Sequence, residues 1–302
     1  MYKSNFNYYP NQKKENQKRL LEEKEHLFSW LNYDSLDYYR HSLMKNFLKK
    51  VINEFPEAKF LTIGDGRFGL DANFLLKYGA KYVHASDIDD TLLKIGAEKK
   101  IINLFSKQNS EMLLFDDNSY DFILCKESLH HFPRPYKALE EMMRVSKKAV
   151  FLIEPRDNFI DRGRFQFILE IIKKIFFKKT PNHQYEPSGN YLYKFSEREL
   201  EKFLLAVNLN KIGFISQNDV YLKGIESVKK KSKKISDLYI ISRFFFKKFI
   251  LDTLTKFGFT KSVLITAALI KDTSELTLKK LKVSGFKIHN LPENKNPYLI
   301  NF

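Results

Sequence analysis

The sequence predicts an α/β protein built on a mostly parallel sheet of seven strands with helices on both faces. Short apolar runs alternate with helical stretches, and further runs follow near the C-terminus, at residues 60–63, 82–85, 122–125, 150–153, 211–215 and 263–270. Strands that alternate with helices favour a parallel sheet covered on both faces. The chain has 302 residues, of which 43% are hydrophobic, so it can bury the core of one large domain with extensions.

Signals at three positions predict where helices begin or end between these runs. The helix after the first strand is predicted to end at Gly79, because glycine favours the left-handed conformation that follows many helices. Pro135 suits the first turn of another helix, where its missing N–H has no intrahelical partner. Ser196 and Glu199 have the spacing of a capping box and predict a helix that continues to Ala206.

We expect three parts along the chain. Residues 1–55 form an N-terminal extension with two helices, residues 56–270 the main domain, and residues 271–302 a C-terminal extension packed on it. Within the main domain, residues 156–195 are a lid-like insertion after the fifth strand. Its first half, from Phe165, has apolar residues on one helix face, which favours docking on the core over a membrane anchor.

Composition limits the setting and the partners. The single cysteine, Cys125, forms no internal disulfide, which suits a reducing cytoplasm. The N-terminus lacks the apolar core of a signal peptide, and cations interrupt the apolar stretch at residues 239–251, so we expect no membrane-spanning segment. The formal charge is +16, but the lysines are spread out apart from runs such as residues 229–234, expected in a solvated loop. We therefore expect no nucleic-acid partner and at most weak peripheral contact with a membrane.

A glycine turn follows the first strand directly. Residues 64–69 have the sequence Gly-Asp-Gly-Arg-Phe-Gly and lead into a helix. Glycines let the backbone turn tightly and approach a ligand, and a helix N-terminus offers free N–H groups. Asp87 stands at the end of the next strand, where a carboxylate can accept hydrogen bonds from both hydroxyls of a ribose. The same letters also satisfy the G-x-G-x-x-G fingerprint of dinucleotide-binding proteins, so these residues alone fit two cofactor classes.

The stretch from residue 109 to residue 155 separates the two classes. Residues 109–122, NSEMLLFDDNSYDF, resemble the D-A-E-x-L-P-F-x-D-x-S-F-D stretch of class I methyltransferases of the ubiquinone-methylating and related small-molecule type. Residues 129–131 and 138–145 resemble the L-H-H and A-L-x-E-x-x-R-V-L segments of the same group. The resemblance implies a Rossmann-like sheet, S-adenosylmethionine as cofactor, and methyl transfer as the reaction.

The resemblance also implies which residues hold the cofactor near the first two strands. Gly64 and Gly66 would back its methionine and ribose portions, with Arg67 in the same turn. Asp87 would hold the ribose hydroxyls, and Ile88 would pack against the adenine ring.

Farther along the chain, the resemblance assigns the adenine and methionine contacts. Asn109 would meet the adenine amine through its side-chain oxygen, and the backbone N–H of Ser110 would meet a ring nitrogen. Cys125 and Lys126, at the end of the fourth strand, would flank the methionine portion. As a lone thiol in an apolar strand, Cys125 is expected to be a small filler and not a nucleophile.

Two positions depart from the family's pattern. Thr62 stands where the family has an acid, two residues before the first glycine. Asp65, inside the turn, is expected to supply part of the missing negative charge near the methionine amine. Asn109 stands where the family usually has Asp, and it keeps an acceptor for the adenine contact.

Methyl transfer from a sulfonium is an in-line displacement, in which the enzyme aligns nucleophile, methyl and sulfur and excludes water. A general base is needed only when the nucleophile is a hydroxyl, a protonated amine or an acidic carbon. His131 or His130 is the chemically suited base, with Glu127 as a further candidate, although paired histidines also serve packing and capping. The sequence has no recognisable metal-ligand spacing, so we expect no metal.

We expect the acceptor pocket between the insertion and the N-terminal helices. The candidate substrate contacts are Glu154, Tyr185, Asn190 and Tyr191. Glu154 equally suits a strand-end hydrogen-bonding role. The acceptor is expected to be a small molecule, or a glycan or lipid-linked one, because residues 60–155 also resemble a narrower bacterial subgroup that includes enzymes of cell-surface glycan assembly. The acceptor's identity, the accepting atom and the oligomeric state stay open.

Three other functions fit part of the pattern. An NAD(P)-dependent oxidoreductase would use the same glycine turn, but residues 109–121 and the L-H-H segment argue against it. A methyltransferase fold that has lost activity and serves as a binding subunit is mildly favoured by Thr62 and Asn109. RNA as the acceptor is compatible with the charge, but no N-P-P-Y or D-P-P-Y signature follows the fourth strand.

Overall fold

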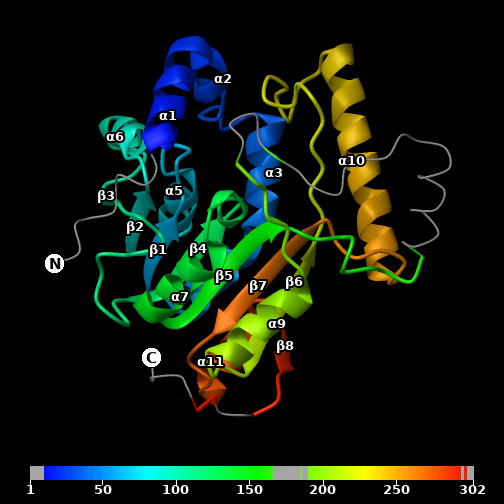
Figure 1. The fold of residues 1–302 in the computed structure, drawn as a ribbon. Helices are drawn as coiled ribbons and strands as arrows, with labels where there is room; N and C mark the ends of the chain where they lie inside the picture. The colour runs from blue at the N-terminus through cyan, green and yellow to red at the C-terminus, as the bar shows by residue number, and fades with distance from the viewer. Residues whose placement is uncertain (1–9, 166–184, 186–189, 294–295, 298–302) are drawn as a thin grey trace.

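A single eight-stranded sheet forms the centre of the computed structural model, which describes residues 10–165, 185, 190–293 and 296–297 (Figure 1). The strands lie in the order β3-β2-β1-β4-β5-β7-β6-β8. Their bounds are β1 Lys59–Ile63, β2 Tyr82–Asp87, β3 Phe105–Lys107, β4 Tyr120–Lys126, β5 Ser146–Pro155, β6 Lys211–Gln217, β7 Leu264–Ile270 and β8 Lys287–Asn290. The central strands are buried almost throughout, as expected for strands covered on both faces.

The strand directions confirm the predicted α/β class and change the strand count. β1 to β5 pair in parallel, whereas β7 is antiparallel to both β5 and β6. Because β5 and β6 both oppose β7, they run in the same direction, and their carboxyl ends lie at the same edge as those of β1 to β4. The sheet has eight strands and not seven, because residues 287–290 add β8 at the outer edge of β6.

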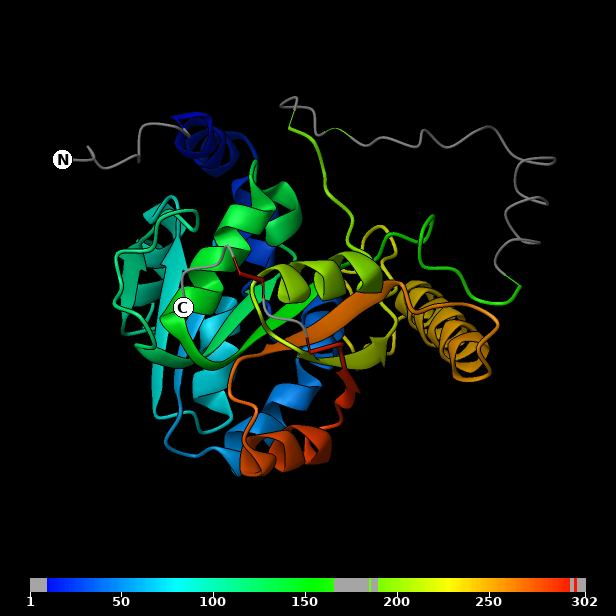
Figure 2. The ribbon, with the colours of Figure 1, turned by 60° about the horizontal axis from the view of Figure 1, so that its bottom comes forward.

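Helices cover both faces of the sheet (Figure 2). On one face, Phe47, Phe74 and Leu281 belong to a buried cluster that includes strand residues. On the other face, Leu139 and Leu200 belong to a second buried cluster. The helices concerned are α4 Asn46–Glu54, α5 Leu70–Lys77, α6 Thr91–Glu98 and α11 Glu275–Val283 on the first face, and α7 Pro135–Val145 and α9 Glu197–Ala206 on the second.

The N-terminal region contains four described helices, so the predicted pair is wrong. α1 and α2 are separated at Glu23, and α3 and α4 at Lys45. Ser35 begins α3 because its side chain accepts a hydrogen bond from the backbone N–H of Tyr38 at 3.0 Å. The helices are α1 Pro10–Glu22, α2 Lys24–Ser29, α3 Leu36–Met44 and α4 Asn46–Glu54. Leu27 and Leu48 are buried in the cluster on the first face, so this region shares the core of the main domain.

The predicted helix boundaries elsewhere are confirmed. Gly79 follows α5 with a φ of +98°, Pro135 opens α7, and Ser196 and Glu199 form both hydrogen bonds of a capping box. A 22-residue helix, α10 Ile235–Lys256, stands at one side of the molecule in both ribbon views (Figures 1 and 2). It is anchored by Phe244, which is fully buried in a third cluster with Leu36 of α3.

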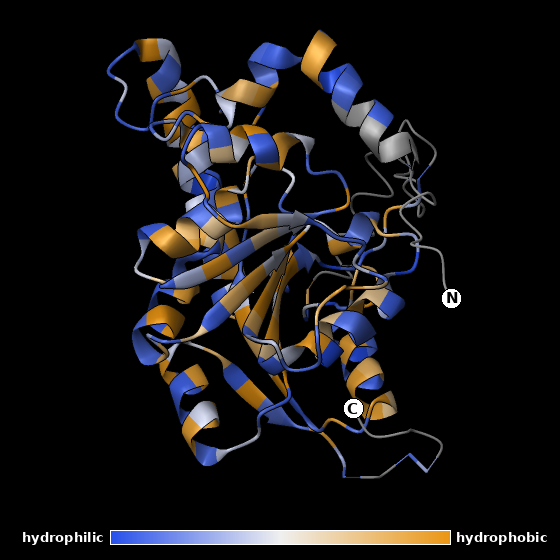
Figure 3. Cartoon of the chain, turned by 90° about the vertical axis from the view of Figure 1, so that its left-hand side faces the viewer, coloured by the Kyte–Doolittle hydropathy of each residue, from blue (hydrophilic) through white to orange (hydrophobic). Residues whose placement is uncertain are grey.

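Hydropathy follows this architecture. Figure 3 shows many hydrophobic residues along the strands and a mixture of hydrophobic and hydrophilic residues along the helices. In the described part of the chain, no helix combines the length and the apolar character needed to cross a bilayer. The amphipathic helix predicted from Phe165 falls on residues 166–184, outside the described residues.

Candidate active site

The glycine turn between β1 and α5 lies against the loop that follows β4. Gly64 and Gly69 have φ angles of +70° and +74°, a region that favours glycine. A Cβ on Gly64 would lie 2.5 Å from the Cβ of Ser128, so any side chain there forces a shift. The Ser128 hydroxyl donates a hydrogen bond to the Gly64 carbonyl oxygen at 2.9 Å. The turn is therefore fixed at the carboxyl edge of the sheet.

Asp87, at the end of β2, faces the same turn. A Cβ on Gly66 would lie 2.9 Å from Oδ2 of Asp87, so the glycine lets the backbone approach the carboxylate. Backbone N–H groups of Gly66, Ile88 and Asp89 donate to this carboxylate. Burial nevertheless raises the pKa of Asp87 to about 7. Asp87 and Ile88 keep part of their surface exposed, which leaves them accessible to a ligand at this edge.

The loop after β3 brings Asn109 and Ser110 to the neighbouring position. Gln108 donates its backbone N–H to the Asp87 carbonyl oxygen at 2.8 Å, which links the two strand ends. The side-chain oxygen of Asn109, which the resemblance assigns to the adenine amine, accepts from the backbone N–H of Glu111 at 3.0 Å. Asn109 is buried and Ser110 is half-buried. Asn109 therefore shapes the turn, and an adenine contact would use the second lone pair of its oxygen.

Asp65 makes local hydrogen bonds within the turn and the helix that follows it. Its carboxylate accepts from the Thr62 hydroxyl at 2.9 Å and from the backbone N–H groups of Asp71 and Ala72 at 3.1 and 2.8 Å. These two N–H groups lie in the first turn of α5, so Asp65 caps that helix. The arrangement also explains why Thr62 is not an acid, because a second carboxylate at that position would lie directly against that of Asp65 and repel it.

A cluster of charged side chains fills the space between α3, the glycine turn and the end of β4. Lys126 pairs with Glu127 at 2.8 Å, and Arg67 stacks on the Trp30 ring, 4.1 Å from its centroid. We call this set the α3 charge cluster; its members are Asp37, Arg40, His41, Lys45, Arg67, Asp71, Lys126, Glu127 and Asp219. Burial and the surrounding cations lower the pKa of His41 well below its usual value, so this ring is neutral.

Glu127 is poorly suited to act as a base. Burial by itself would raise its pKa, but Lys126 and Arg40 hold the pKa of Glu127 at about 2. A carboxylate with so low a pKa gains little by taking a proton near neutral pH. Lys126 is buried and pairs with Glu127, so both residues are engaged by ion pairs within the α3 charge cluster.

Glu154 holds the segment that carries the two histidines. Its side chain is fully buried, and one oxygen accepts from the backbone N–H groups of Ser128 and Leu129 at 3.1 and 2.9 Å. Its other oxygen lies 2.6 Å from Nδ1 of His130, in the short helix η2 Leu129–His131. This geometry fits the strand-end role of Glu154 and gives it no direct route to a substrate. The fully buried Cys125 lies beside it, and burial raises the pKa of that thiol, which fits a filler.

The described part of the insertion returns to the same histidines. The Asn190 side chain donates to the carbonyl oxygen of His131 at 2.7 Å. Tyr191 stacks edge-on with Tyr185, their ring centroids 5.4 Å apart. The structure thus brings Asn190 and the tyrosines near the end of β4, whereas residues 166–184 and 186–189 lie outside the described residues.

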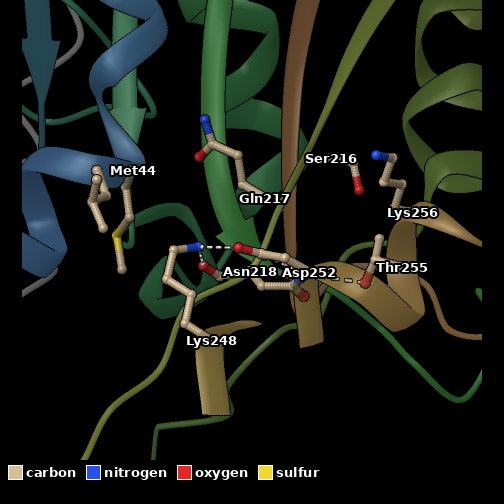
Figure 4. A pocket seen from close by; sticks show the side chains of 9 residues that line it. Met44, Ser216, Gln217, Asn218, Lys248, Asp252, Thr255 and Lys256 are labelled. Atoms are coloured by element: carbon tan, nitrogen blue, oxygen red, sulfur yellow. Dashed lines mark hydrogen bonds and ion pairs between the residues drawn. The ribbon is translucent and has the colours of Figure 1, made fainter. Parts of the chain in front are cut away.

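Sequence reasoning missed a cavity of about 380 Å³ at the carboxyl end of β6 (Figure 4). Asn218 donates to Asp252 at 3.0 Å and to Thr255 at 3.1 Å, and Lys248 donates to Asp252 at 2.9 Å. The lining residues come from α3, β6 and α10: Leu43, Met44, Ser216, Gln217, Asn218, Lys248, Asp252, Thr255 and Lys256. The signal in the sequence was the polar run Ser-Gln-Asn at a strand end, a position where α/β folds bind ligands.

Comparison with known families agrees with this geometry. Residues 61–153 match the family model described as a methyltransferase domain. This segment holds the glycine turn, Asp87 and the loop after β4, which meet at one edge of the sheet. Residues 61–153 are therefore similar to a methyltransferase domain, in agreement with the resemblance seen in the sequence.

The chain is also similar to individual curated proteins and to a solved structure. The chain is similar to the ubiquinone/menaquinone biosynthesis C-methyltransferases UbiE of Shewanella sediminis and Idiomarina loihiensis, with 31% and 32% identity over 121 residues. Each match covers 38% of this chain and 48% of the relative, so the chain spans about half the length of these curated relatives. It is also similar to the solved structure of the YcgJ protein from Bacillus subtilis, at 21% identity and a TM-score of 0.46, over 75% of this chain and 96% of that one.

Proposed function

We propose that this protein transfers a methyl group from S-adenosylmethionine to a small-molecule acceptor by in-line displacement. The observation that carries the proposal is the approach of the Gly66 backbone to the Asp87 carboxylate at adjacent strand ends, inside the methyltransferase domain. That arrangement leaves a partly exposed carboxylate beside a close backbone, which suits a ribose diol.

The residues present fit the ribose and adenine ends of the cofactor. Asp87 would accept from the ribose hydroxyls, Ile88 would pack on the adenine ring, and Ser110 would offer its backbone N–H, since each is partly exposed at the same edge. When bound, S-adenosylmethionine supplies a methyl group on an electron-poor sulfur. The carboxylates of the α3 charge cluster are the nearest candidates for its methionine amine, because Asp65 is engaged by α5.

His130 is the stronger of the two candidate bases. The Glu154 carboxylate lies 2.6 Å from Nδ1 of His130, so a proton on Nδ1 would be held by this carboxylate and Nε2 would be the proton acceptor. The same pairing of carboxylate and imidazole orients bases in other enzymes. His131 stacks on His130 with ring centroids 4.0 Å apart, and it would line the site beside it.

The polar cavity at the end of β6 is the proposed acceptor pocket, together with Asn190 and the tyrosines of the insertion. Its amide, hydroxyl, ammonium and carboxylate groups suit a hydroxylated acceptor, including a glycan or a lipid-linked one. α3 contributes Leu43 and Met44 to its wall, as expected if the N-terminal extension of residues 1–55 helps to build the pocket. We further propose that residues 56–270 act as the catalytic unit and that the protein works in the cytoplasm.

Calorimetric titration with S-adenosylhomocysteine, run beside NAD, tests the cofactor assignment. We expect binding of the first and none of the second, and Asp87→Ala should abolish binding. Asp90→Ala is the matched control, because its carboxylate pairs with Lys94 outside the strand end. Binding of NAD alone would indicate an oxidoreductase and refute the proposal.

Methyl-labelled S-adenosylmethionine tests the transfer itself. Incubation with the small-molecule and lipid fractions of a bacterial extract should place label in one fraction with the wild type and not with Asp87→Ala. Intact cofactor binding without any labelled product would refute methyl transfer and favour a binding subunit.

A further inference from the structure

The outward face of α10 is apolar, and its large side chains are exposed among the described residues. Along this helix only Phe244 is fully buried, whereas five exposed large apolar side chains lie on the opposite side and Phe257 follows directly after the helix. We call these six residues the α10 apolar face; with their exposed fractions they are Ile235 (87%), Leu238 (47%), Tyr239 (62%), Phe246 (67%), Phe249 (69%) and Phe257 (64%). Apolar residues in such number on one helix face mark an interaction surface.

Cations surround this face. The lysines of the run at residues 229–234 are exposed just before the helix begins, and Arg243 and Lys247 are exposed within it. Of the two carboxylates of α10, Asp252 pairs with Lys248 and Asp237 accepts from the Ser232 hydroxyl at 2.6 Å, and the seven exposed cations named above outnumber them. The surroundings of the α10 apolar face are therefore positively charged.

We propose that the α10 apolar face docks on the surface of an anionic lipid bilayer. Exposed aromatic and aliphatic side chains next to Lys and Arg can insert at the surface of a bilayer without crossing it. Aromatic side chains sit favourably at the depth of the lipid headgroups, and the flanking cations are attracted by anionic headgroups. A second copy of this chain would instead bring like charges together around the apolar contact, so the charge pattern favours lipid.

Docking in this orientation would place α10 between the membrane and the cavity of Figure 4. Lys248, Asp252, Thr255 and Lys256 line that cavity from α10 (Figure 4). The docking itself does not rest on the proposed methyl transfer.

Vesicle co-sedimentation of the full chain tests the docking. The probes are vesicles of phosphatidylcholine alone and of phosphatidylcholine mixed equally with phosphatidylglycerol. We expect binding only to the anionic vesicles, weakened by added salt. Phe246→Ser/Phe249→Ser should reduce the binding constant by at least about tenfold, since two exposed aromatic rings no longer insert. Lys231→Gln/Lys233→Gln/Lys234→Gln should also reduce it by at least about tenfold.

Matched controls keep the test independent of folding and of the cofactor. Leu114→Ser/Leu276→Ser removes two exposed apolar side chains elsewhere, and Lys279→Gln/Lys282→Gln/Lys287→Gln removes three exposed lysines elsewhere; both should bind vesicles like the wild type. Titration with S-adenosylhomocysteine should give the same affinity for every variant. Equal vesicle binding by the serine variant and the wild type would overturn the proposal. So would a wild-type dimer that ignores vesicles and becomes a monomer in Phe246→Ser/Phe249→Ser.

Discussion

Protonation of Asp87 should control cofactor affinity near neutral pH. Its carboxylate is the proposed partner of two ribose hydroxyls, which can both donate only to an ionised carboxylate. Burial raises the pKa of Asp87 to about 7, although three backbone N–H groups favour the ionised form. A fall in pH through neutrality should therefore weaken binding of S-adenosylhomocysteine.

The magnitude follows from the fraction of protein in the ionised state. With a pKa of about 7, that fraction is about nine-tenths at about pH 8 and about one-tenth at about pH 6. The apparent dissociation constant should thus rise about tenfold over this interval, equivalent to about 1.4 kcal/mol. Binding below neutrality should also release up to about one proton per site, because the ligand selects the ionised form.

Calorimetry in buffers of different ionisation enthalpy measures both quantities. Asp87→Asn is the control, since its amide has no charge to lose: it should bind more weakly and without this pH dependence. The effect of pH on folding stability has the opposite sign to its effect on cofactor affinity. Because the folded-state pKa exceeds the unfolded value, the unliganded wild type loses stability as pH rises from about 4 to about 7, and Asp87→Asn should melt at a higher temperature at about pH 8. Affinity that is flat across neutrality in the wild type would refute the reasoning.

Further predictions concern the groups that hold the site. Glu154→Gln should release the Nδ1–H of His130, which nitrogen chemical shifts in NMR spectra would show as a change of tautomer; an unchanged tautomer would contradict the positioning role. Gly64→Ala should lower the free energy of unfolding by more than about 1 kcal/mol, measured in urea, because of its positive φ and the nearby Ser128; Gly224→Ala, in open space, gives the comparison for φ alone. Thr62→Val should lower the free energy of unfolding by about 1–2 kcal/mol in the same assay, because the buried carboxylate of Asp65 loses a hydrogen-bond donor. Thr62→Ser keeps the hydroxyl and should retain most of this stability.

Much of the fold could be predicted because its signals are local. Buried strands appear as apolar runs, and the capping box at Ser196 or the glycine after α5 depends on residues that are neighbours in sequence. The errors arose where local signals are weak. β8 is a four-residue edge strand with mixed polarity, and the breaks at Glu23 and Lys45 involve residues that favour helices, so packing on the core decides where these helices end.

The strand-end positions of the candidate site were predictable for a topological reason. In a parallel sheet the carboxyl ends of adjacent strands meet, so the glycine turn and Asp87 had to be neighbours. The hydrogen-bond partners were not predictable, because they depend on contacts between distant segments. Glu154 and His130 are 24 positions apart, and the cavity beside α10 combines residues of α3 with residues some 200 positions later.

The α3 charge cluster does not account for the excess positive charge of the sequence. The α3 charge cluster holds as many cations as carboxylates: Arg40, Lys45, Arg67 and Lys126 against Asp37, Asp71, Glu127 and Asp219. Buried ions are kept in balance because an unpaired one would be costly to desolvate. The net charge of +16 therefore comes from groups outside this cluster, where it contributes to long-range attraction of anions. The exposed lysines of the run at residues 229–234 are part of this charge, and their place just before the α10 apolar face is where attraction to anionic lipid would assist docking.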